Sequence, residues 1–386
     1  MPRKSLWHRL THWFQAAPAP AGQRSVIYEV TTRCNLACRY CYNVWNETDY
    51  ARDELDTTGA LRLVERIREQ TGCMLLTFTG GEPLLRTDLE LLVRHARFLG
   101  MSCNLITNGT LLTPERARSL VEAGIGLFET PLLGSDGTVV AGLHGTRPPT
   151  VLPATIDHSL PRAESRGPST IASAPEAFHV LSRTQSAILD ITQAGGEVVA
   201  AFVATRANID QALDAARLSF ALGAAGMMFN RFNPGGRGGT NRADLLPAPD
   251  QLARALGDLD RFAADEGFPV SCSIPIPPCV LDTTPYSHLS FGYCAAATDR
   301  AYYTVDPAGR LRMCNHSPSV LGSLLDESFE DLTARSRTAF FLDPVPEFCK
   351  GCPHLATCRC CCRAAAESCQ GDLTRLDPFV EAHGRR

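Results

Sequence analysis

The sequence predicts an α/β protein in which a parallel sheet with flanking helices precedes a small cysteine-rich region. Strand-like and helix-like patterns alternate six times between residues 25 and 270, as in a parallel sheet with crossover helices. Cysteines crowd the part of the chain after residue 270. The chain has 386 residues, 44% of them hydrophobic and 20% charged, which suffices for one large domain and a smaller one.

Six strand–helix units make up the predicted sheet region. Runs of apolar and β-branched residues predict the strands, and amphipathic periods predict the helices. The functional loops of such a sheet lie at the carboxyl ends of its strands, where each motif of this region falls. The expected strands cover residues 25–31, 73–79, 101–107, 125–133, 197–205 and 225–232, and the expected helices cover 57–70, 88–99, 114–123, 176–194, 210–222 and 249–266.

Two segments stand apart from this alternation. Residues 1–24 begin with an amphipathic helix pattern and end in a linker of Pro and Ala. Such a helix either covers the bottom of the main domain or docks on a partner or a membrane surface. Residues 146–175 are rich in Pro, Ser and Thr and show no period, which predicts a flexible insertion.

Charge and sorting signals limit the classes of function. The formal net charge of −4 provides no general basic field for nucleic acid. No apolar run is long enough to cross a membrane, and the N-terminus lacks the apolar segment of a signal peptide. We therefore expect a cytoplasmic protein with reduced thiols, in which metal or cluster binding is the better use of 16 cysteines.

The stretch 31–43 is the one around which we expect the chemistry to be organised. It places Cys34, Cys38 and Cys41 in a loop directly after the first strand, with three and two residues between them. Three thiolates can wrap one face of a [4Fe–4S] cluster and leave one iron open for a non-protein ligand. The alternatives are a zinc site or three buried thiols, although the first gap is one residue longer than in a Cys-x-x-Cys unit.

The pattern Cys34-x-x-x-Cys38-x-Tyr40-Cys41 resembles the signature of the radical S-adenosylmethionine (SAM) enzymes. In that family the amino and carboxyl groups of SAM chelate the open iron. One electron then cleaves SAM to methionine and a 5′-deoxyadenosyl radical, which takes a hydrogen atom from the substrate. The resemblance implies that residues 25–270 form a partial (β/α)6 TIM-like barrel, with Tyr40 among the residues near the cofactor.

Later loops resemble SAM-binding motifs of the same family. Gly80-Gly81-Glu82-Pro83 looks like the motif that binds the SAM amino group, since Glu82 can pair with an ammonium and glycines let the backbone approach a ligand. Outside this context, it and the Asn-Gly pair after strand 101–107 would be plain turns. By the same resemblance, the other expected contacts to cofactor or substrate are Thr107, Asn108, Asn208, Arg231 and Asn233.

The fourth strand departs from the family pattern. Relatives commonly carry Ser-Leu-Asp-Gly at its end, whereas this chain has Pro131 and Leu133 at the Ser and Asp positions. The usual polar contacts near the SAM ribose therefore have no counterpart there. The candidates to replace them are Glu129, Thr130, Ser135 and Asp136.

A second cysteine array lies in the expected domain 271–386, which contains a β-hairpin and short helices. Its spacing resembles the SPASM domain, the C-terminal module in which many radical SAM enzymes hold two further [4Fe–4S] clusters. The alternative is a pair of zinc knuckles, because Cys-x-x-Cys also suits zinc. The matching positions are Cys294, Cys314, Cys349, Cys352, Cys358, Cys362 and Cys369.

The SPASM resemblance divides these cysteines between two auxiliary clusters. The second would be held by Cys349, Cys352, Cys358 and Cys369. The first would be held by Cys294, Cys314 and Cys362 with an upstream ligand, for which Cys279 is the candidate and Cys272 the reserve. The neighbouring Cys360 and Cys361 leave another register open.

The resemblance implies a net two-electron oxidation, in which auxiliary clusters accept the electron left after hydrogen abstraction. Because many relatives act on peptides, we expect maturation of a ribosomally made peptide. Flavodoxin or ferredoxin would donate electrons, and a separate partner or the N-terminal helix would hold the leader peptide. The alternatives are oxidation of a small molecule or tetrapyrrole precursor, and a non-catalytic iron–sulfur electron carrier.

A candidate base lies beside the auxiliary array. Sulfatase maturases commonly carry an Asp base next to an auxiliary-cluster cysteine, whereas Asn315 follows Cys314 here and cannot take a proton. His316 comes next and has a suitable unperturbed pKa for a base. The alternative is a solvated histidine without a catalytic role.

Overall fold

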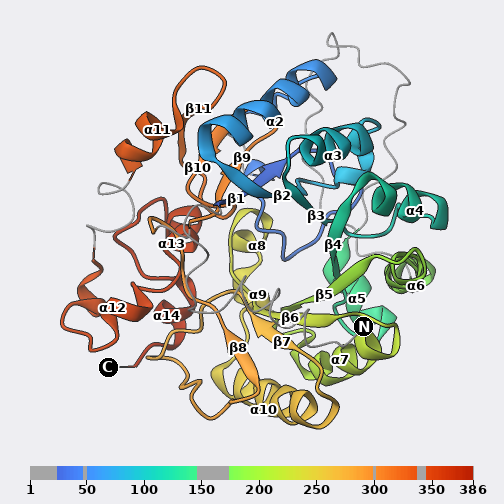
Figure 1. The fold of residues 1–386 in the computed structure, drawn as a ribbon. Coiled ribbons are helices and arrows are strands. Elements are labelled where there is room, and N and C mark those ends of the chain that lie inside the picture. Colours follow the sequence, from blue (N-terminus) through green and yellow to red (C-terminus); the bar gives the residue numbers. More distant parts are fainter. Residues whose placement is uncertain (1–23, 47–49, 146–173, 299–300, 337–344, 386) are drawn as a thin grey trace.

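An eleven-stranded sheet organises the computed structural model, in which residues 24–46, 50–145, 174–298, 301–336 and 345–385 are described (Figure 1). The strand order is β11-β10-β9-β1-β2-β3-β4-β5-β6-β7-β8. Pairing is parallel from β9 through β1 to β8, and β10 is antiparallel to β9 and β11. The strands are β1 (Arg24–Glu29), β2 (Cys73–Thr79), β3 (Ser102–Ile106), β4 (Ile125–Pro131), β5 (Glu197–Ala204), β6 (Gly226–Arg231), β7 (Val270–Cys272), β8 (Leu289–Phe291), β9 (Tyr303–Val305), β10 (Arg310–Arg312) and β11 (Val320–Ser323).

Helices lie around the outside of the curved sheet (Figure 1). The longer ones follow the barrel strands, and short ones fill the C-terminal region. They are α2 (Thr57–Thr71), α3 (Leu89–Phe98), α4 (Pro114–Ala123), α5 (Gly137–His144), α6 (Ala174–Gln193), α7 (Ala212–Ala221), α8 (Gly236–Thr240), α9 (Arg242–Leu245), α10 (Pro249–Glu266), α11 (Phe329–Ser336), α12 (Leu355–Cys358), α13 (Arg363–Gln370) and α14 (Pro378–His383), with 3₁₀ turns η1 (Val44–Asn46), η2 (Pro83–Leu85), η3 (Ile209–Gln211) and η4 (Glu347–Cys349).

The predicted α/β fold is confirmed, and all six strand–helix units are present with small shifts at their ends. Local signals explain the boundaries. The Asp56 side chain accepts a hydrogen bond from the Gly59 backbone at the start of α2, and Gly72 ends the helix in the left-handed conformation. The buried face of α2 packs Leu63 and Ile67 onto the sheet. The strands read as apolar runs because a parallel sheet is covered by helices.

The C-terminal region extends the barrel's own sheet. β9 pairs with β1, with Val26 opposite Tyr303, and the predicted hairpin follows as β9–β10. At the other edge, β7 contains the predicted domain boundary at residue 270. Two ion pairs with fully buried or nearly fully buried side chains also tie the two regions together. They join Arg312 to Glu29, and Arg231 to Asp377 at 2.6 Å.

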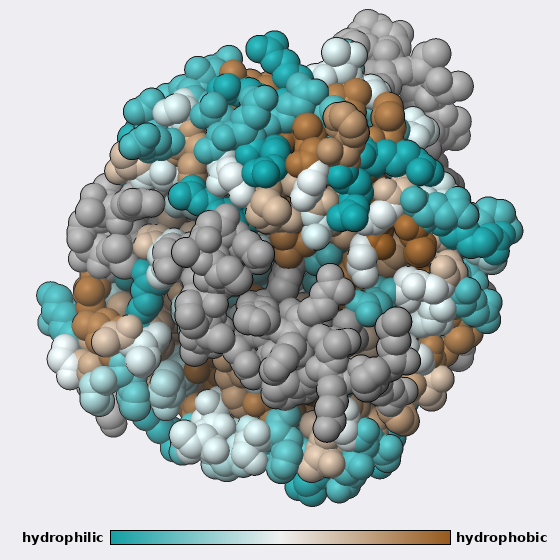
Figure 2. All heavy atoms as spheres, viewed as in Figure 1, coloured by the Kyte–Doolittle hydropathy of each residue, from teal (hydrophilic) through white to brown (hydrophobic). Residues whose placement is uncertain are grey.

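Two predictions concern segments that the structure does not describe. The N-terminal helix lies outside the described residues, as does the insertion up to residue 173. None of the helices described is both long and apolar enough to cross a membrane. Hydrophilic and hydrophobic residues are interspersed on the face shown in Figure 2.

Candidate active site

A cavity of about 400 Å³ runs from the loop after β1 to the residues that flank two C-terminal cysteines. Its barrel wall comes from strands β1 to β6 and from the loops that follow β1, β2, β3 and β6. Its far end includes Tyr293 and Ala295, which flank Cys294, and Asn315, which follows Cys314. The predicted site residues that line it are Cys34, Cys38, Tyr40, Cys41, Gly80, Gly81, Thr107, Asn108, Arg231, Asn233 and His316.

The first cysteine loop is held by backbone hydrogen bonds to neighbouring loops. The Gly81 amide donates to the Thr31 carbonyl, and the Glu82 amide to the Arg33 carbonyl. On the other side, the end of α5 and the start of α8 contribute further bonds. These are Ala37 N to Gly145 O, Arg39 N to Leu143 O and Gly238 N to Cys41 O, each 2.8 Å.

The Gly-Gly pair allows this close approach. A Cβ on Gly81 would lie 2.1 Å from the Arg33 carbonyl oxygen, and one on Gly80 would lie 2.4 Å from the Thr31 carbonyl oxygen. Gly80 also has a φ of 141°, which disfavours other residues. Both glycines line the cavity, but it is the backbone of the cysteine loop that leaves no room for a side chain at these positions.

Each sulfur of this loop has a nitrogen donor beside it. The Leu36 backbone nitrogen lies 3.5 Å from Cys34 Sγ, and Asn46 Nδ2 lies 3.3 Å from Cys41 Sγ. His144 Nδ1 lies 3.3 Å from Cys38 Sγ. Burial lowers the pKa of His144 to about 4, so the ring is neutral at pH 7. Nitrogen donors around thiolates are the usual support of an iron–sulfur cluster, so the donor set fits one.

The far end of the cavity gathers a second group of cysteines. Burial first, and then nearby Asp377, Cys294 and Cys314, raise the pKa of Cys362. Burial and the neighbouring Cys294 raise the pKa of Cys314 to about 12. Such thiols stay protonated until a metal or cluster takes the proton's place. Cys294, Cys314 and Cys362, predicted as one set, are thus close enough to influence one another's pKa values.

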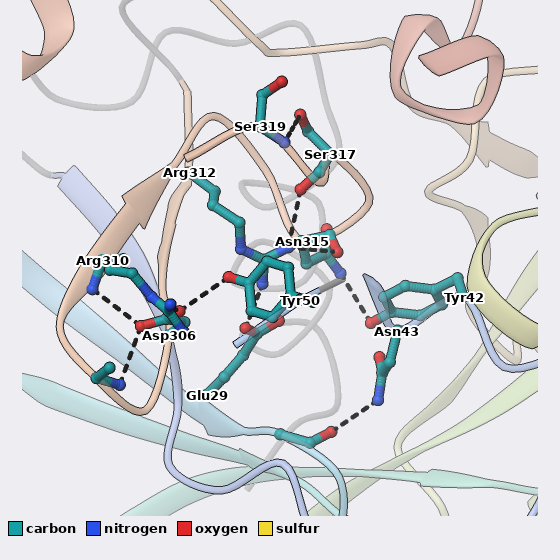
Figure 3. Close-up of polar contacts among 12 residues, drawn as sticks. Glu29, Tyr42, Asn43, Tyr50, Asp306, Arg310, Arg312, Asn315, Ser317 and Ser319 are labelled. Atoms are coloured by element: carbon teal, nitrogen blue, oxygen red, sulfur yellow. Dashed lines mark hydrogen bonds and ion pairs between the residues drawn. The ribbon is translucent and has the colours of Figure 1, made fainter. Parts of the chain in front are cut away.

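The turn that carries Cys314 is fixed to the barrel by Arg312, as Figure 3 shows. The Arg312 guanidinium pairs with Glu29 of β1 and donates to the carbonyls of Asn315 and Ser317. Asn315 Nδ2 in turn donates to the Tyr42 hydroxyl at 2.8 Å, which brings the turn against the first cysteine loop. The two ends of the cavity are thus joined by direct polar contacts.

The third group of cysteines contains Cys349, Cys352 and Cys358, and its neighbours differ from the expected ligand set. Burial and the neighbouring thiols of Cys358 and Cys352 raise the pKa of Cys279, so this cysteine lies with the second predicted set. Cys360 lies beside Cys349 in the same group. Cys369 instead lies on α13, where a Cβ on Gly239 would be 3.3 Å from its sulfur. The reserve candidate, Cys272, is buried in β7.

The thiols do not converge as they would around a single ion. Among the described residues, no three His, Cys, Asp or Glu side chains come together closely enough to hold one metal ion. A zinc knuckle needs four ligands at about 2.0–2.3 Å from one point. A cluster spreads its cysteines, because each thiolate binds a different iron.

Comparisons with known proteins agree with this geometry. The sequence model of the Radical SAM superfamily matches residues 28–148. The chain is 28% identical over 363 residues to a PqqA peptide cyclase of Methylocella silvestris, covering 92% of this chain and 86% of the relative. A PqqA peptide cyclase of Xanthomonas campestris pv. campestris is 28% identical over 367 residues, with the same coverage. The chain is thus similar to the radical SAM superfamily over residues 28–148 and to PqqA peptide cyclases over most of its length.

Solved structures share the fold of this chain. One is native anSMEcpe with bound AdoMet, with a TM-score of 0.64 and 18% identity, covering 93% of this chain and 94% of that one. Another is Streptococcus suis SuiB bound to precursor peptide SuiA, with a TM-score of 0.64 and 12% identity, covering 98% and 79%. The SPASM-type relatives therefore match nearly the whole chain.

Glu82, expected to pair with the ammonium of SAM, is not among the residues that line the cavity. Its carboxylate is fully buried and accepts hydrogen bonds from the Leu84 and Asn108 backbones and the Thr107 hydroxyl. Its role toward SAM stays a prediction, and within the protein the three donors hold the carboxylate in place. Pro83 is buried beside it at the start of η2 and is likewise absent from the lining.

Two other predicted contacts, Asn208 and Arg231, have hydrogen-bond partners within the protein. Asn208 is buried away from the cavity, where its amide donates to the Leu133 carbonyl and its oxygen accepts from Thr205. Arg231 borders the cavity, but its guanidinium donates to Asp377 and to the Pro275 carbonyl. Its charge is therefore committed to the C-terminal region and not directed at cofactor or substrate.

His316 and Asn233 form a polar contact at the far end of the cavity. Asn233 Nδ2 lies 3.2 Å from His316 Nδ1 and 3.1 Å from Cys362 Sγ, whereas Asn233 Oδ1 is buried without a partner among the described residues. His316 stacks on Tyr42 with ring centroids 4.0 Å apart. Burial, together with Arg231 and Arg312, lowers the pKa of His316 to about 3. The premise of an unperturbed pKa is therefore wrong, and the ring is a weak base.

Sequence reasoning missed two residues of the site, Asn46 and His144, which support the first cysteine loop. Glu129, one of the candidates named for the fourth strand, lines the cavity from β4. Asn46 lies only five positions after Cys41, which was a usable signal. His144 has no local signal, because α5 brings it back to Cys38 from 106 positions along the chain.

Proposed function

We propose that this radical SAM enzyme carries out a net two-electron oxidation of a ribosomally made peptide. The observation that carries the proposal is the cavity itself, because one end is bordered by Cys34, Cys38 and Cys41 and the other by the neighbours of Cys294 and Cys314. A substrate between these ends would be within reach of both cysteine groups. Peptides are favoured because the relatives are named as a PqqA peptide cyclase and as SuiB bound to precursor peptide SuiA.

Each cysteine group has a place in this proposal. Cys34, Cys38 and Cys41 would hold a [4Fe–4S] cluster, which with SAM on its open iron supplies the 5′-deoxyadenosyl radical that removes a hydrogen atom. Cys294, Cys314 and Cys362 would hold the first auxiliary cluster. Cys349, Cys352 and Cys358, with Cys279 or Cys369, would hold the second. Flavodoxin or ferredoxin is the proposed electron donor, and a separate partner would hold a leader peptide.

The protein's own residues position and protect this chemistry. Asn46 and His144 would donate to cysteine sulfurs and fix the first cluster's orientation. Arg237 holds Asn46 through a 2.8 Å hydrogen bond to its side-chain oxygen. Apolar residues of the wall, including Ile27, Val203 and Met228, keep water from the barrel interior. Thr107 and Asn108 would line the SAM pocket, and Asn233 would offer its free oxygen to a ligand.

The test is anaerobic reconstitution, reduction and incubation with SAM and a short peptide encoded beside the gene. We expect 5′-deoxyadenosine and a peptide that has lost two hydrogen atoms, measured by mass spectrometry. A Cys34/Cys38/Cys41→Ala variant should form neither. Turnover of a tetrapyrrole with no change in the peptide would favour the small-molecule alternative, and clusters without any SAM cleavage would favour an electron carrier.

A further inference from the structure

Glu129 places a carboxylate on the cavity side of β4, level with the last residue of β3. In β4, Phe128 and Thr130 are fully buried on one face, whereas Glu129 and Pro131 line the cavity on the other. Glu129 lies two residues before the end of the strand, in register with Ile106 of β3.

No cation of the described residues balances this carboxylate. Among the described residues that line the cavity, Glu129 is the only acid, and its carboxylate has no hydrogen bond or ion pair with another described residue. The cavity's arginines are committed elsewhere. Arg231 pairs with Asp377, Arg237 donates to the Cys38 carbonyl and to Asn46, and the Arg24 guanidinium lies over the Phe329 ring.

The contrast with Glu82 shows that this arrangement is not a general feature of the barrel. Glu82 is buried deeper but accepts three hydrogen bonds. Burial raises the pKa of Glu129 to about 7, and no donor or cation lowers it. Tyr42 also lines the cavity, and its pKa is raised by burial and by Glu29 and Glu129. A partly desolvated carboxylate without a partner is costly, and functional sites are where such groups occur.

We propose that Glu129 is the binding point for a cationic group of a ligand inside the barrel. Two ligands could supply the cation: a basic side chain of the substrate peptide, or the sulfonium or ammonium of SAM. The peptide source rests on the proposed function, whereas the cation-binding role does not. A charge-assisted hydrogen bond formed there replaces the missing protein partner and fixes the ligand's position relative to the cysteine loop.

The experiment compares wild type with Glu129→Gln, which keeps the shape and removes the charge. Glu122→Gln is the matched control, because Glu122 is an exposed glutamate on α4 outside the cavity. The reconstituted enzyme is titrated anaerobically, by calorimetry, with SAM. With SAM bound, it is then titrated with two blocked pentapeptides that differ only in a central lysine or norleucine. SAM cleavage is assayed on the same samples.

If a peptide supplies the cation, wild type and Glu122→Gln will bind the lysine peptide about tenfold more tightly than the norleucine peptide. Glu129→Gln will lose that preference with its norleucine affinity unchanged. If SAM supplies the cation, Glu129→Gln will bind SAM about tenfold more weakly, and no variant will prefer lysine. Unchanged SAM affinity without any lysine preference that depends on Glu129 overturns the proposal. Wild type that never forms 5′-deoxyadenosine overturns the proposed function instead, whatever the titrations show.

Discussion

The two cysteine regions of this enzyme are built in different ways. The first loop sits on a barrel of regular strands and helices, and backbone hydrogen bonds with glycine contacts fix it from several sides. The C-terminal region contains strands of three or four residues and helices of four to eight. In it, Arg359, Cys360 and Cys361 follow one another with φ values of 54°, 64° and 61°. Each such residue costs of order 1 kcal/mol and persists only where its surroundings impose it.

This difference indicates what each region needs in order to fold. The barrel buries a continuous apolar core, so its order comes from packing. The C-terminal region depends on long-range side-chain ties, such as Arg359 donating to the carbonyls of Cys294 and Ala296. With so little regular structure, the proposed clusters would supply much of its stability. The first loop should therefore keep its shape without iron, and the C-terminal arrays should not.

The largest expected effect is that of iron removal. Anaerobic chelation should raise amide hydrogen exchange in α12 and α13 by roughly a hundredfold, because opening there would no longer require breaking a cluster. Exchange in α2 and α3 should change little. Hydrogen exchange with mass spectrometry measures both regions at once. An equal loss of protection in α2 and α3 would contradict the proposed difference between the two regions.

The next largest effect concerns the buried ion pair between Arg231 and Asp377, which joins the two regions. Arg231→Met leaves the Asp377 carboxylate buried without its cation and should lower the free energy of unfolding by about 3–5 kcal/mol. The double variant Arg231→Met/Asp377→Leu removes both charges and should recover most of that loss. Urea denaturation monitored in each region gives the values. A single variant as stable as wild type would show that the pair does not hold the C-terminal region in place.

The pH dependence of stability tests the cavity carboxylate of the barrel. The pKa of Glu129 is raised in the folded protein from 4.5 to about 7, so the folded state binds the proton more tightly than the unfolded state. Its contribution to stability is therefore full below pH 4.5 and is lost as pH rises through 7. Glu129→Gln should be about 3 kcal/mol more stable than wild type at pH 8.5, and about 2 kcal/mol more stable at pH 6. A difference independent of pH would contradict the raised pKa.

A smaller effect is expected from the nitrogen donors of the first loop. His144→Phe keeps an aromatic ring against Tyr40, whose centroid lies 5.8 Å away, but removes the donor to Cys38. Loss of such a support weakens metal binding about 10–100-fold. Iron release from the first cluster to a chelator should accelerate accordingly, as followed by electron paramagnetic resonance. His95→Phe, on α3 outside the cavity, is the control and should release iron as wild type does.

Local patterns predicted the barrel and the cysteine groups, because the sequence signals for both lie among neighbouring residues. The first loop is set by three cysteines within eight residues, and each strand by its own apolar run. The errors came from partners that are far apart in the sequence. Arg231 meets Asp377 146 positions later, and Cys279 lies beside Cys358, so neither contact has a local signal.

Two other misses had different physical causes. The motif containing Glu82 was recognised, but the pattern could not show that Thr107 and two backbone amides satisfy its carboxylate. The helix α5 was not predicted because its residues include Gly137 and Gly142, which are poor helix formers. Asp136 starts it nevertheless by accepting hydrogen bonds from the Thr138 and Val139 amides.

The central claim is that one cavity joins a SAM-cleaving cysteine loop to a separate auxiliary array. The most direct test is iron counting and SAM cleavage in two variants, Cys34/Cys38/Cys41→Ala and Cys294/Cys314/Cys362→Ala. Wild type should hold about twelve irons, and each variant about four fewer. The first variant should form no 5′-deoxyadenosine, whereas the second should still form it but fail to complete the oxidised peptide. Full SAM cleavage in the first variant, or its loss in a folded second variant that keeps its first cluster, would contradict the account.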